Sequence, residues 1–335
     1  MRVAVVGAGG VGGLVGGLLA HAGLEVAFVA RGAQLAALRE GGLRVDSPRA
    51  TFHLPRVEAA EDPGALAPAD VVLVAVKGWQ VREVAPRLTA LCKPDGFALP
   101  LENGVEAASA LARALGEARV VGGLCHLFAW VEEPGVVKHA GELLRITMGE
   151  RQGGTSERLE RFAGALRAAK IDAVLTPDIE AALWEKFLFI DAFGTVGAVT
   201  RAPVGVVRSL EPTRGLLRSA MEETAAVARA RGVRLAADAV DKALRLIDGV
   251  APASTASMHR DLVAGRPSEL PDQPGAVVRL AAEVGVEVPV HRVLLAALLP
   301  QETAARGGRF DPFADPWGQK KPVSGERPSD GAPKS

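Results

Sequence analysis

The stretch RVAVVGAGGVGG, residues 2–13, places a run of β-forming residues directly before a group of glycines. An uninterrupted apolar run of this kind is typical of a parallel strand that is buried on both faces. Gly7, Gly9 and Gly12 stand at GxGxxG spacing. In that motif the first glycine permits a tight turn, the second lets backbone approach a pyrophosphate, and the third lets helix pack on strand. The spacing alone also fits a purely structural turn, so the surrounding sequence has to decide.

The residues that follow supply the context. Leu14, Leu18 and Leu19 recur at helical spacing, Gly23 ends the helix, and LEVAFVAR (residues 24–31) reads as a second strand. Together they form a βαβ unit of about 30 residues, in which helix-opening amides and the helix dipole favour phosphate. We therefore predict a dinucleotide site. The residues expected to form its turn are Gly7, Ala8, Gly9, Gly10, Val11 and Gly12.

The residues at the end of the second strand indicate whether a chain of this kind binds NAD or NADP. NAD-binding chains usually carry an acid there, which holds the ribose hydroxyls. This chain has Ala30 in the acidic position, followed by Arg31. A guanidinium pairs well with a 2′-phosphate, and here no carboxylate repels it. We predict NADP(H) as the cofactor; the alternative is that Arg31 is an ordinary solvated residue after a strand.

The pattern of strand followed by helix continues beyond this unit. Residues 69–81 predict a buried strand with Lys77 at its carboxyl end, and residues 96–115 repeat the pattern with Asn103 at the turn. Short apolar runs over residues 119–148 favour an antiparallel extension of the sheet. A helix and a strand, ending at residue 176, then close a Rossmann-type, doubly wound α/β domain over residues 1–176.

The remainder of the chain is dominated by helical periodicity. An all-α domain is predicted over residues 177–310, and a polar tail rich in glycine and proline, over residues 311–335, is predicted to be disordered. A homodimer formed through exposed helices is compatible with this pattern. The segments with a 3.6-residue apolar period are residues 178–200, 211–232, 236–250 and 272–285.

Composition narrows the classes of partner. Hydrophobic residues make up 48% of the 335, enough for a sizeable core, and 39 basic residues balance 39 acidic ones, which argues against nucleic acid. Two cysteines without a pairing pattern exclude a disulfide framework and a four-cysteine zinc site, so no metal is expected and a reducing cytoplasm fits best. The uncharged residues 3–20 are glycine-rich and read as strand and turn, not as a membrane span.

Missing residue types narrow the chemistry of a reductase. The chain has no tyrosine, which excludes the short-chain dehydrogenases, and too few cysteines for a zinc alcohol dehydrogenase. Most of its six histidines lie in predicted loops or at predicted strand edges, where a surface role is commoner than a catalytic one. Lys186 remains as the proton donor, because bulky apolar neighbours flank it and such surroundings favour proton release. The alternative is an interfacial lysine that extends past aromatic rings.

From residue 1 to about residue 300 the chain resembles the ketopantoate reductase (2-dehydropantoate 2-reductase) family. Five short segments carry this resemblance through their order and spacing. The resemblance implies a Rossmann domain and a helical domain, with NADPH reducing a 2-oxo acid in the cleft between them. The segments are VAVVGAGGVGG (3–13), VAVKGWQV (74–81), LENGVE (101–106), LWEKF (183–187) and SMHRDLVAGRPSELP (257–271).

The resemblance also implies roles for individual residues. Lys186 matches the catalytic lysine that protonates the nascent hydroxyl, and Glu269 matches the acid that hydrogen-bonds substrate and helps to place that lysine. Ser257 matches a serine that binds the substrate carboxylate. Asn103 matches an asparagine beside nicotinamide and substrate, and Lys77 a lysine near the cofactor's ribose. Taken without the resemblance, Glu269 would be a solvated loop acid and Ser257 a helix cap.

Some positions depart from the family pattern. Family members typically carry asparagines four and eight residues after the catalytic lysine, where this chain has Ile190 and Gly194. Asp191 is adjacent but projects away from Lys186 on an ideal helix. An asparagine usual near Gln273 is also missing. A substrate hydroxyl left without a partner costs about 1–3 kcal/mol, so the reaction type is better supported than the substrate.

These observations predict NADPH-dependent reduction of 2-dehydropantoate to pantoate, a step of pantothenate and coenzyme A biosynthesis. Two alternatives stay open. One is a reductase of a less polar 2-oxo acid; the other is a non-catalytic NADP-binding sensor that kept the fold.

Overall fold

The valine-rich opening stretch forms the central strand of a parallel sheet. In the computed structural model, which describes residues 1–308, β1 (Arg2–Val6) pairs in parallel with β2 (Glu25–Val29) and β6 (Ala69–Val74). Two outer strands, β5 (Glu58–Ala60) and β7 (Cys92–Pro100), complete the order β5-β2-β1-β6-β7. The Rossmann-type α/β fold expected from the sequence is confirmed.

Elements cover both faces of this sheet. Val3 and Val5 pack on one side, while Ala4 and Val6 pack on the other. The first side meets α1 (Gly10–His21) and α5 (Glu157–Ala168), and the second meets α3 (Val81–Val84) and α4 (Ala107–Leu115). β1 is therefore apolar at every interior position, as a strand covered on both faces requires. A further helix, α2 (Gly32–Glu40), follows β2.

The antiparallel strands do not extend the parallel sheet, so that prediction was wrong. After one bridge between Val120 and Ala98, the chain leaves the parallel sheet and builds a second sheet, ordered β10-β9-β3-β4, with β8 antiparallel to β9. Glycines on α1 let this sheet pack closely: a Cβ at Gly10 would overlap the carbonyl oxygen of Ala129. The strands are β3 (Leu43–Asp46), β4 (Thr51–Leu54), β8 (Gly122–Glu133), β9 (Val136–Gly149) and β10 (Asp172–Leu175).

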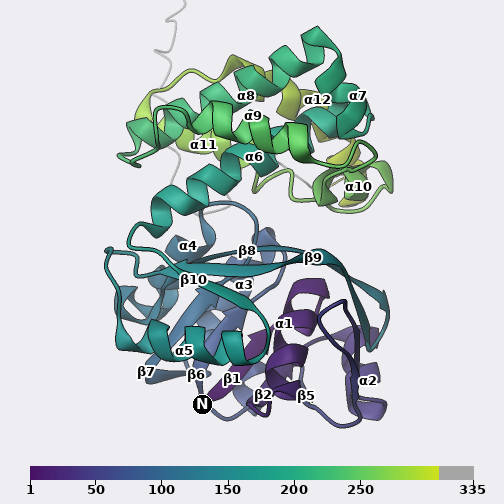
Figure 1. The fold of residues 1–335 in the computed structure, drawn as a ribbon, viewed down its shortest axis with the longest axis vertical. Coiled ribbons are helices and arrows are strands. Elements are labelled where there is room, and N and C mark those ends of the chain that lie inside the picture. The colour runs from purple at the N-terminus through teal and green to yellow at the C-terminus, as the bar shows by residue number, and fades with distance from the viewer. Residues whose placement is uncertain (309–335) are drawn as a thin grey trace, which may run out of the picture.

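A helical lobe follows, stacked on the α/β lobe in Figure 1, with the long helix α6 running up into it. Asp178 caps the first turn of α6 by accepting a hydrogen bond from the Ala181 backbone N–H. The predicted helices are present, and α7, α10 and α12 are additional. The helices are α6 (Ile179–Thr200), α7 (Val204–Ser209), α8 (Glu211–Ala230), α9 (Ala239–Gly249), α10 (Ser257–Val263), α11 (Pro274–Val284) and α12 (Pro289–Ala305).

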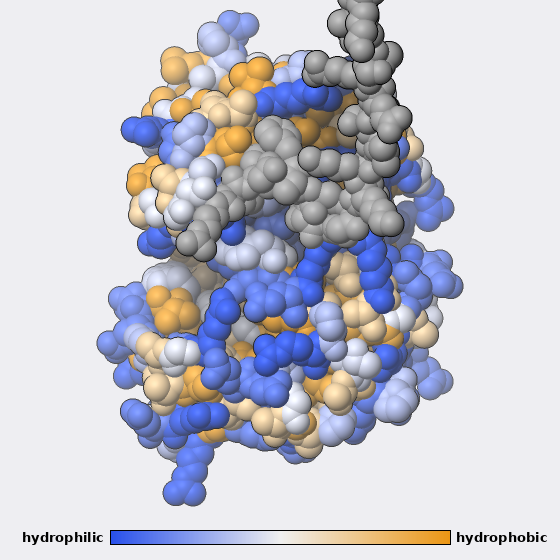
Figure 2. Space-filling model, turned by 180° about the vertical axis from the view of Figure 1, so that it is seen from behind, coloured by the Kyte–Doolittle hydropathy of each residue, from blue (hydrophilic) through white to orange (hydrophobic). Residues whose placement is uncertain are grey.

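The structure does not test the predicted domain boundary or the predicted tail. The boundary at residue 176 stays a prediction, and the predicted tail, residues 311–335, lies outside the described residues. Over residues 1–308, no helix has the length and apolarity needed to cross a bilayer. Figure 2 shows hydrophilic side chains running across the α/β lobe, with apolar ones scattered between them.

Candidate active site

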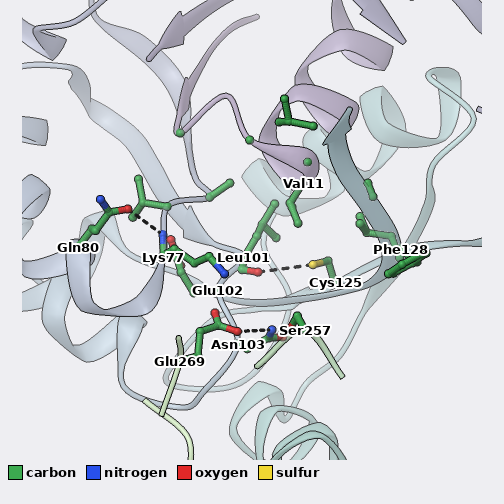
Figure 3. Close-up of a pocket in the computed structure, with 18 of the residues that line it drawn as sticks. Val11, Lys77, Gln80, Leu101, Glu102, Asn103, Cys125, Phe128, Ser257 and Glu269 are labelled. Carbon is green, nitrogen blue, oxygen red and sulfur yellow. Dashed lines mark hydrogen bonds between the residues drawn. The ribbon is translucent and has the colours of Figure 1, made fainter. Parts of the chain in front are cut away.

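A cleft of about 1310 Å³ lies where the two lobes meet. The α/β lobe contributes the glycine turn after β1 and the loops after β6 and β7, and the helical lobe contributes α6, α10 and the loop before α11. This position follows from the topology, because the strand order reverses beside β1 and ligands of open α/β sheets bind at such switch points. In Figure 3 Val11 lies on one side of the pocket, with Ser257, Asn103 and Glu269 across from it.

The glycine turn fits a dinucleotide phosphate. Gly7 has a φ of +100°, and a Cβ there would lie 2.7 Å from the carbonyl oxygen of Ala75. At Gly9 a Cβ would meet nothing within 4 Å, so the backbone is open to the cleft. Gly12 lies beneath the turn and does not line the cleft; a Cβ there would overlap the Gly7 carbonyl oxygen. The three glycines thus have the steric environments that their roles in the motif demand.

Arg31 lines the cleft where β2 ends. Its side chain is exposed, and within residues 1–308 it forms no ion pair, so its charge is available to an anion. Next to it, the amide of Gln34 donates to the Ala8 carbonyl oxygen at 2.9 Å and accepts from the Gly135 backbone N–H at 3.0 Å. The turn is therefore tied both to α2 and to the β8–β9 hairpin.

The opposite part of the cleft holds a hydrogen-bonded chain of three side chains. Lys186 Nζ, on α6, donates to Asn103 Oδ1 at 3.0 Å. Asn103 Nδ2 in turn donates to Glu269 Oε2 at 3.1 Å, the bond drawn between these two residues in Figure 3. Gln273 Nε2 donates to the same Glu269 oxygen at 3.3 Å. Asn103 therefore stands between the two residues expected to act on substrate. The expected influence of Glu269 on Lys186 runs through this amide.

Two further titratable side chains, His126 and Glu102, line the cleft with these polar groups. Burial, followed by the charge of Lys186, lowers the pKa of His126 to about 4, so this imidazole on β8 is neutral at pH 7. Burial raises the pKa of Glu102 well above its usual range, with the Glu269 charge adding to it. Neither carboxyl oxygen of Glu102 has a hydrogen-bond partner among residues 1–308. Both side chains line the same cleft as Lys186, and neither was predicted as a site residue from the sequence.

Two further predicted residues lie on the rim. Ser257 is the first residue of α10 and lines the cleft. Lys77 Nζ lies 3.0 Å from Asp261 Oδ2, so an ion pair joins the loop after β6 to α10 across the cleft. Its nitrogen also lies 5.8 Å from the ring centroid of Trp79.

The positions that depart from the family pattern have separate explanations. Ile190 lines the cleft and presents an apolar surface one turn beyond Lys186. Gly194 does not line it, because Gln273 occupies the adjacent space: a Cβ at Gly194 would lie 3.1 Å from Gln273 Oε1. Asp191 is fully buried on the far side of α6, where its Oδ2 lies 2.7 Å from His291 Nε2.

Comparison with known proteins agrees with this geometry. Residues 3–153 match the family model described as ketopantoate reductase PanE/ApbA, and residues 178–302 match the model of its C-terminal part. The chain belongs to the ketopantoate reductase family. Family membership makes it an oxidoreductase that acts on a 2-oxo acid.

The similarity to individual members of the ketopantoate reductase family extends over nearly the whole chain. The 2-dehydropantoate 2-reductase of Halobacterium salinarum is 35% identical over 298 residues, which are 88% of this chain and 96% of that protein. A PanE/ApbA family ketopantoate reductase from Ralstonia eutropha has a crystal structure that superposes with a TM-score of 0.84 at 31% identity, covering 91% of this chain and 100% of that one. A D-mandelate dehydrogenase shares the fold at 19% identity, with a TM-score of 0.84.

Proposed function

We propose that this chain reduces 2-dehydropantoate to pantoate with NADPH, a step of pantothenate biosynthesis. The observation that carries the proposal is the Lys186–Asn103–Glu269 chain, which lines the same cleft as the glycine turn. A proton donor and a dinucleotide site facing one cavity are what ketone reduction needs. The 35% identity to a 2-dehydropantoate 2-reductase over most of both chains supports this choice of substrate.

NADPH bound at the glycine turn supplies the hydride for the ketone carbon. Lys186 Nζ donates its proton to the ketone oxygen, and its positive charge stabilises the negative charge that develops there. Asn103 Oδ1 accepts a hydrogen bond from that ammonium and so fixes its direction. Glu269 fixes the Asn103 amide and leaves a carboxylate oxygen that can accept a hydrogen bond from substrate. Phe189, Ile190 and Phe193 line the cleft with Lys186 and would limit the access of water to a bound ketone.

Preference for NADPH over NADH rests on Arg31. Its guanidinium, which forms no ion pair within residues 1–308, lines the cleft beyond the end of β2, where the 2′-phosphate of a dinucleotide on this turn would lie. Ala30, in the position of the usual acid, leaves that phosphate without a repelling carboxylate.

A less polar 2-oxo acid is the second candidate, and one specific feature favours it. Phe189, Ile190 and Phe193 line the cleft on the same helix as Lys186. These side chains suit a branched apolar substituent but offer no partner to a hydroxyl. Such a hydroxyl, if buried without a partner, costs about 1–3 kcal/mol of binding.

The deciding experiment follows oxidation of NADPH with a panel of 2-oxo acids. The panel includes 2-dehydropantoate and 3-methyl-2-oxobutanoate, which lacks only the hydroxymethyl group. We expect kcat/KM to be larger for 2-dehydropantoate than for 3-methyl-2-oxobutanoate. A larger value for 3-methyl-2-oxobutanoate would favour a less polar substrate. Tight NADPH binding without turnover of any member would refute the reductase and favour a sensor.

A further inference from the structure

One charged side chain in the cleft has no role in the scheme above. Arg260 lines the cavity from α10, three residues after Ser257, and is partly buried. One guanidinium nitrogen, Nη1, donates to the backbone oxygen of Thr255 and lies 3.4 Å from its Oγ1. The guanidinium carbon lies 5.1 Å from the ring centroid of Phe128, which comes from β8 in the other lobe. The side chain is thus held in one orientation by contacts from both lobes.

The Arg260 guanidinium has no carboxylate within ion-pair distance in the described part of the chain. The nearest acid in sequence, Asp261, already contacts Lys77 at 3.0 Å and Arg266 at 2.9 Å. A partly buried charge without a counterion is unfavourable, unless a ligand supplies the opposite charge. The cavity that Arg260 lines is where such a ligand would bind.

We propose that Arg260 binds the carboxylate of the 2-oxo acid and so determines specificity for acids; this rests on the proposed function. A planar guanidinium matches a carboxylate with two parallel hydrogen bonds, and Nη1 alone is engaged by Thr255. The contact with the Phe128 ring restricts the movement of the guanidinium before substrate arrives. Ser257, one helical turn earlier, supplies a hydroxyl toward the same group.

The anion could in principle come from substrate or from the cofactor's phosphates, and the layout favours substrate. The groups suited to phosphate, namely the glycine turn and Arg31, belong to the α/β lobe. Arg260 belongs to the helical lobe, which also carries Lys186 and Glu269. A charged anchor at this place also offsets the loss of polar contacts at Ile190, because it retains the acid through its carboxylate instead of through a hydroxyl.

The test measures binding of oxamate, a non-reducible 2-oxo acid analogue, to the NADPH complex of the full chain. We expect Arg260→Gln to raise the Kd of oxamate about 10- to 100-fold, the scale of hydrogen bonds to charged groups, while the Kd of NADPH stays unchanged. Arg260→Lys, which keeps the charge but not the fork, should restore part of the affinity. Neutral oxamide, as a matched ligand, should bind the wild type and Arg260→Gln equally weakly.

Three results would overturn the inference: an unchanged oxamate Kd in Arg260→Gln, a wild-type complex that binds oxamate no better than oxamide, or a rise confined to the Kd of NADPH, which would assign the anion to the cofactor. Unchanged thermal unfolding of the variant shows that it folds. Because oxamate binding needs no turnover, failure here is distinct from failure of the proposed function, which would appear as absent turnover in the wild type.

Discussion

Asn103 is the residue on which the geometry of the reacting groups depends. It joins Lys186, on one helix, to Glu269, in a loop 83 residues further along the chain than that lysine, through hydrogen bonds of 3.0 and 3.1 Å. Because the amide presents its oxygen to the ammonium and its nitrogen to the carboxylate, its orientation is fixed by both partners. We therefore expect the Glu269 carboxylate to influence Lys186, the proposed proton donor, through the Asn103 amide.

Glu269→Gln tests this arrangement. The substitution keeps the size of the side chain but replaces an oxygen that accepts from Asn103 and Gln273 with a group that can also donate. We expect kcat to fall about 10- to 100-fold, at the lower end of the range for acid–base contributions, with the Kd of NADPH unchanged. Steady-state kinetics and NADPH titration measure the two quantities. An unchanged kcat would show that Glu269 has no part in placing the donor.

Arg31 gives a prediction about the cofactor. Arg31→Ala should raise the Kd of NADPH about 10- to 100-fold, since a charge-assisted hydrogen bond to phosphate is lost, and should leave the Kd of NADH nearly unchanged. Fluorescence titration of the reduced nicotinamide measures both. Arg39→Ala is the matched control, because Arg39 lies on α2, the helix that Arg31 directly precedes, but outside the cleft. Equal changes for the two dinucleotides would remove the 2′-phosphate argument.

At the residue scale, short sequence motifs predicted most of the residues that line the cleft. The burial of individual side chains could not be predicted from the sequence. The glycine turn, Arg31, Lys77, Asn103, Lys186, Ser257 and Glu269 could be named because each lies in a short recognisable segment, and all line the cleft except Gly12. Their roles stay predictions. Glu102, His126 and Arg260 were missed as cleft residues, because their environment comes from distant elements. Most of the six histidines were predicted to have surface roles, yet His139, His259 and His291 are buried.

At the element scale, two glycines of the turn between β1 and α1 have separate functions: Gly9 lets the cofactor approach, and Gly12 lets the helix pack. Gly9→Ala should leave the melting temperature unchanged, because the new Cβ meets no atom within 4 Å, but it should weaken NADPH binding where the pyrophosphate approaches. Gly12→Ala should lower the melting temperature, because its Cβ would overlap the Gly7 carbonyl oxygen and lie 2.9 Å from Val5 Cγ1. Thermal unfolding with NADPH titration tests the pair; an equally large loss of stability in both would contradict this division.

A buried charge cluster ties α6 to two other helices. His291, on α12, lies 2.7 Å from Asp191 on α6 and 2.7 Å from Glu223 on α8. Burial alone would lower the pKa of His291, but the two carboxylates raise it to about 9. The imidazolium is therefore bound to both acids at neutral pH, behind the helix that carries Lys186.

This cluster predicts a pH-dependent stability. Because the folded-state pKa of His291 lies above its ordinary value of 6.5, its contribution is full below pH 6.5 and is lost as pH rises through about 9. His291→Gln should cost about 3–5 kcal/mol of unfolding free energy at pH 6, the scale of breaking a buried pair, and less at pH 10. Urea unfolding at both pH values measures this. A cost that does not shrink with pH would contradict an imidazolium at this position.

Element prediction succeeded where periodicity was long and failed where pairing was non-local. The 22-residue helix α6 was predicted from its apolar period, whereas its Asp178 cap was not predicted. α10 has only 7 residues, too few to show a period, and α12 contains Pro300, which interrupts one. The second sheet could not be predicted, because β9 pairs with β3 across about 90 residues of intervening chain, a partner that alternation does not reveal.

At the scale of the whole molecule, ion pairs and hydrogen bonds between the two lobes hold the walls of the cleft together. Glu106, before α4, pairs with Arg279 on α11 at 2.7 Å, and both are largely buried. Lys77 pairs with Asp261, and Asn103 contacts both Lys186 and Glu269. The order of the lobes was predictable from the change of period at residue 177. These pairings were not, because each joins residues more than 80 positions apart.

The central claim is that Lys186 protonates a ketone held against the cofactor in this cleft. The most direct measurement is kcat/KM for 2-dehydropantoate with NADPH in Lys186→Ala, beside Lys242→Ala, which removes an exposed lysine of α9. The account predicts a fall of about 10²- to 10⁴-fold for Lys186→Ala with an unchanged Kd for NADPH, and wild-type behaviour for the control. Activity retained within a few-fold in Lys186→Ala would contradict it.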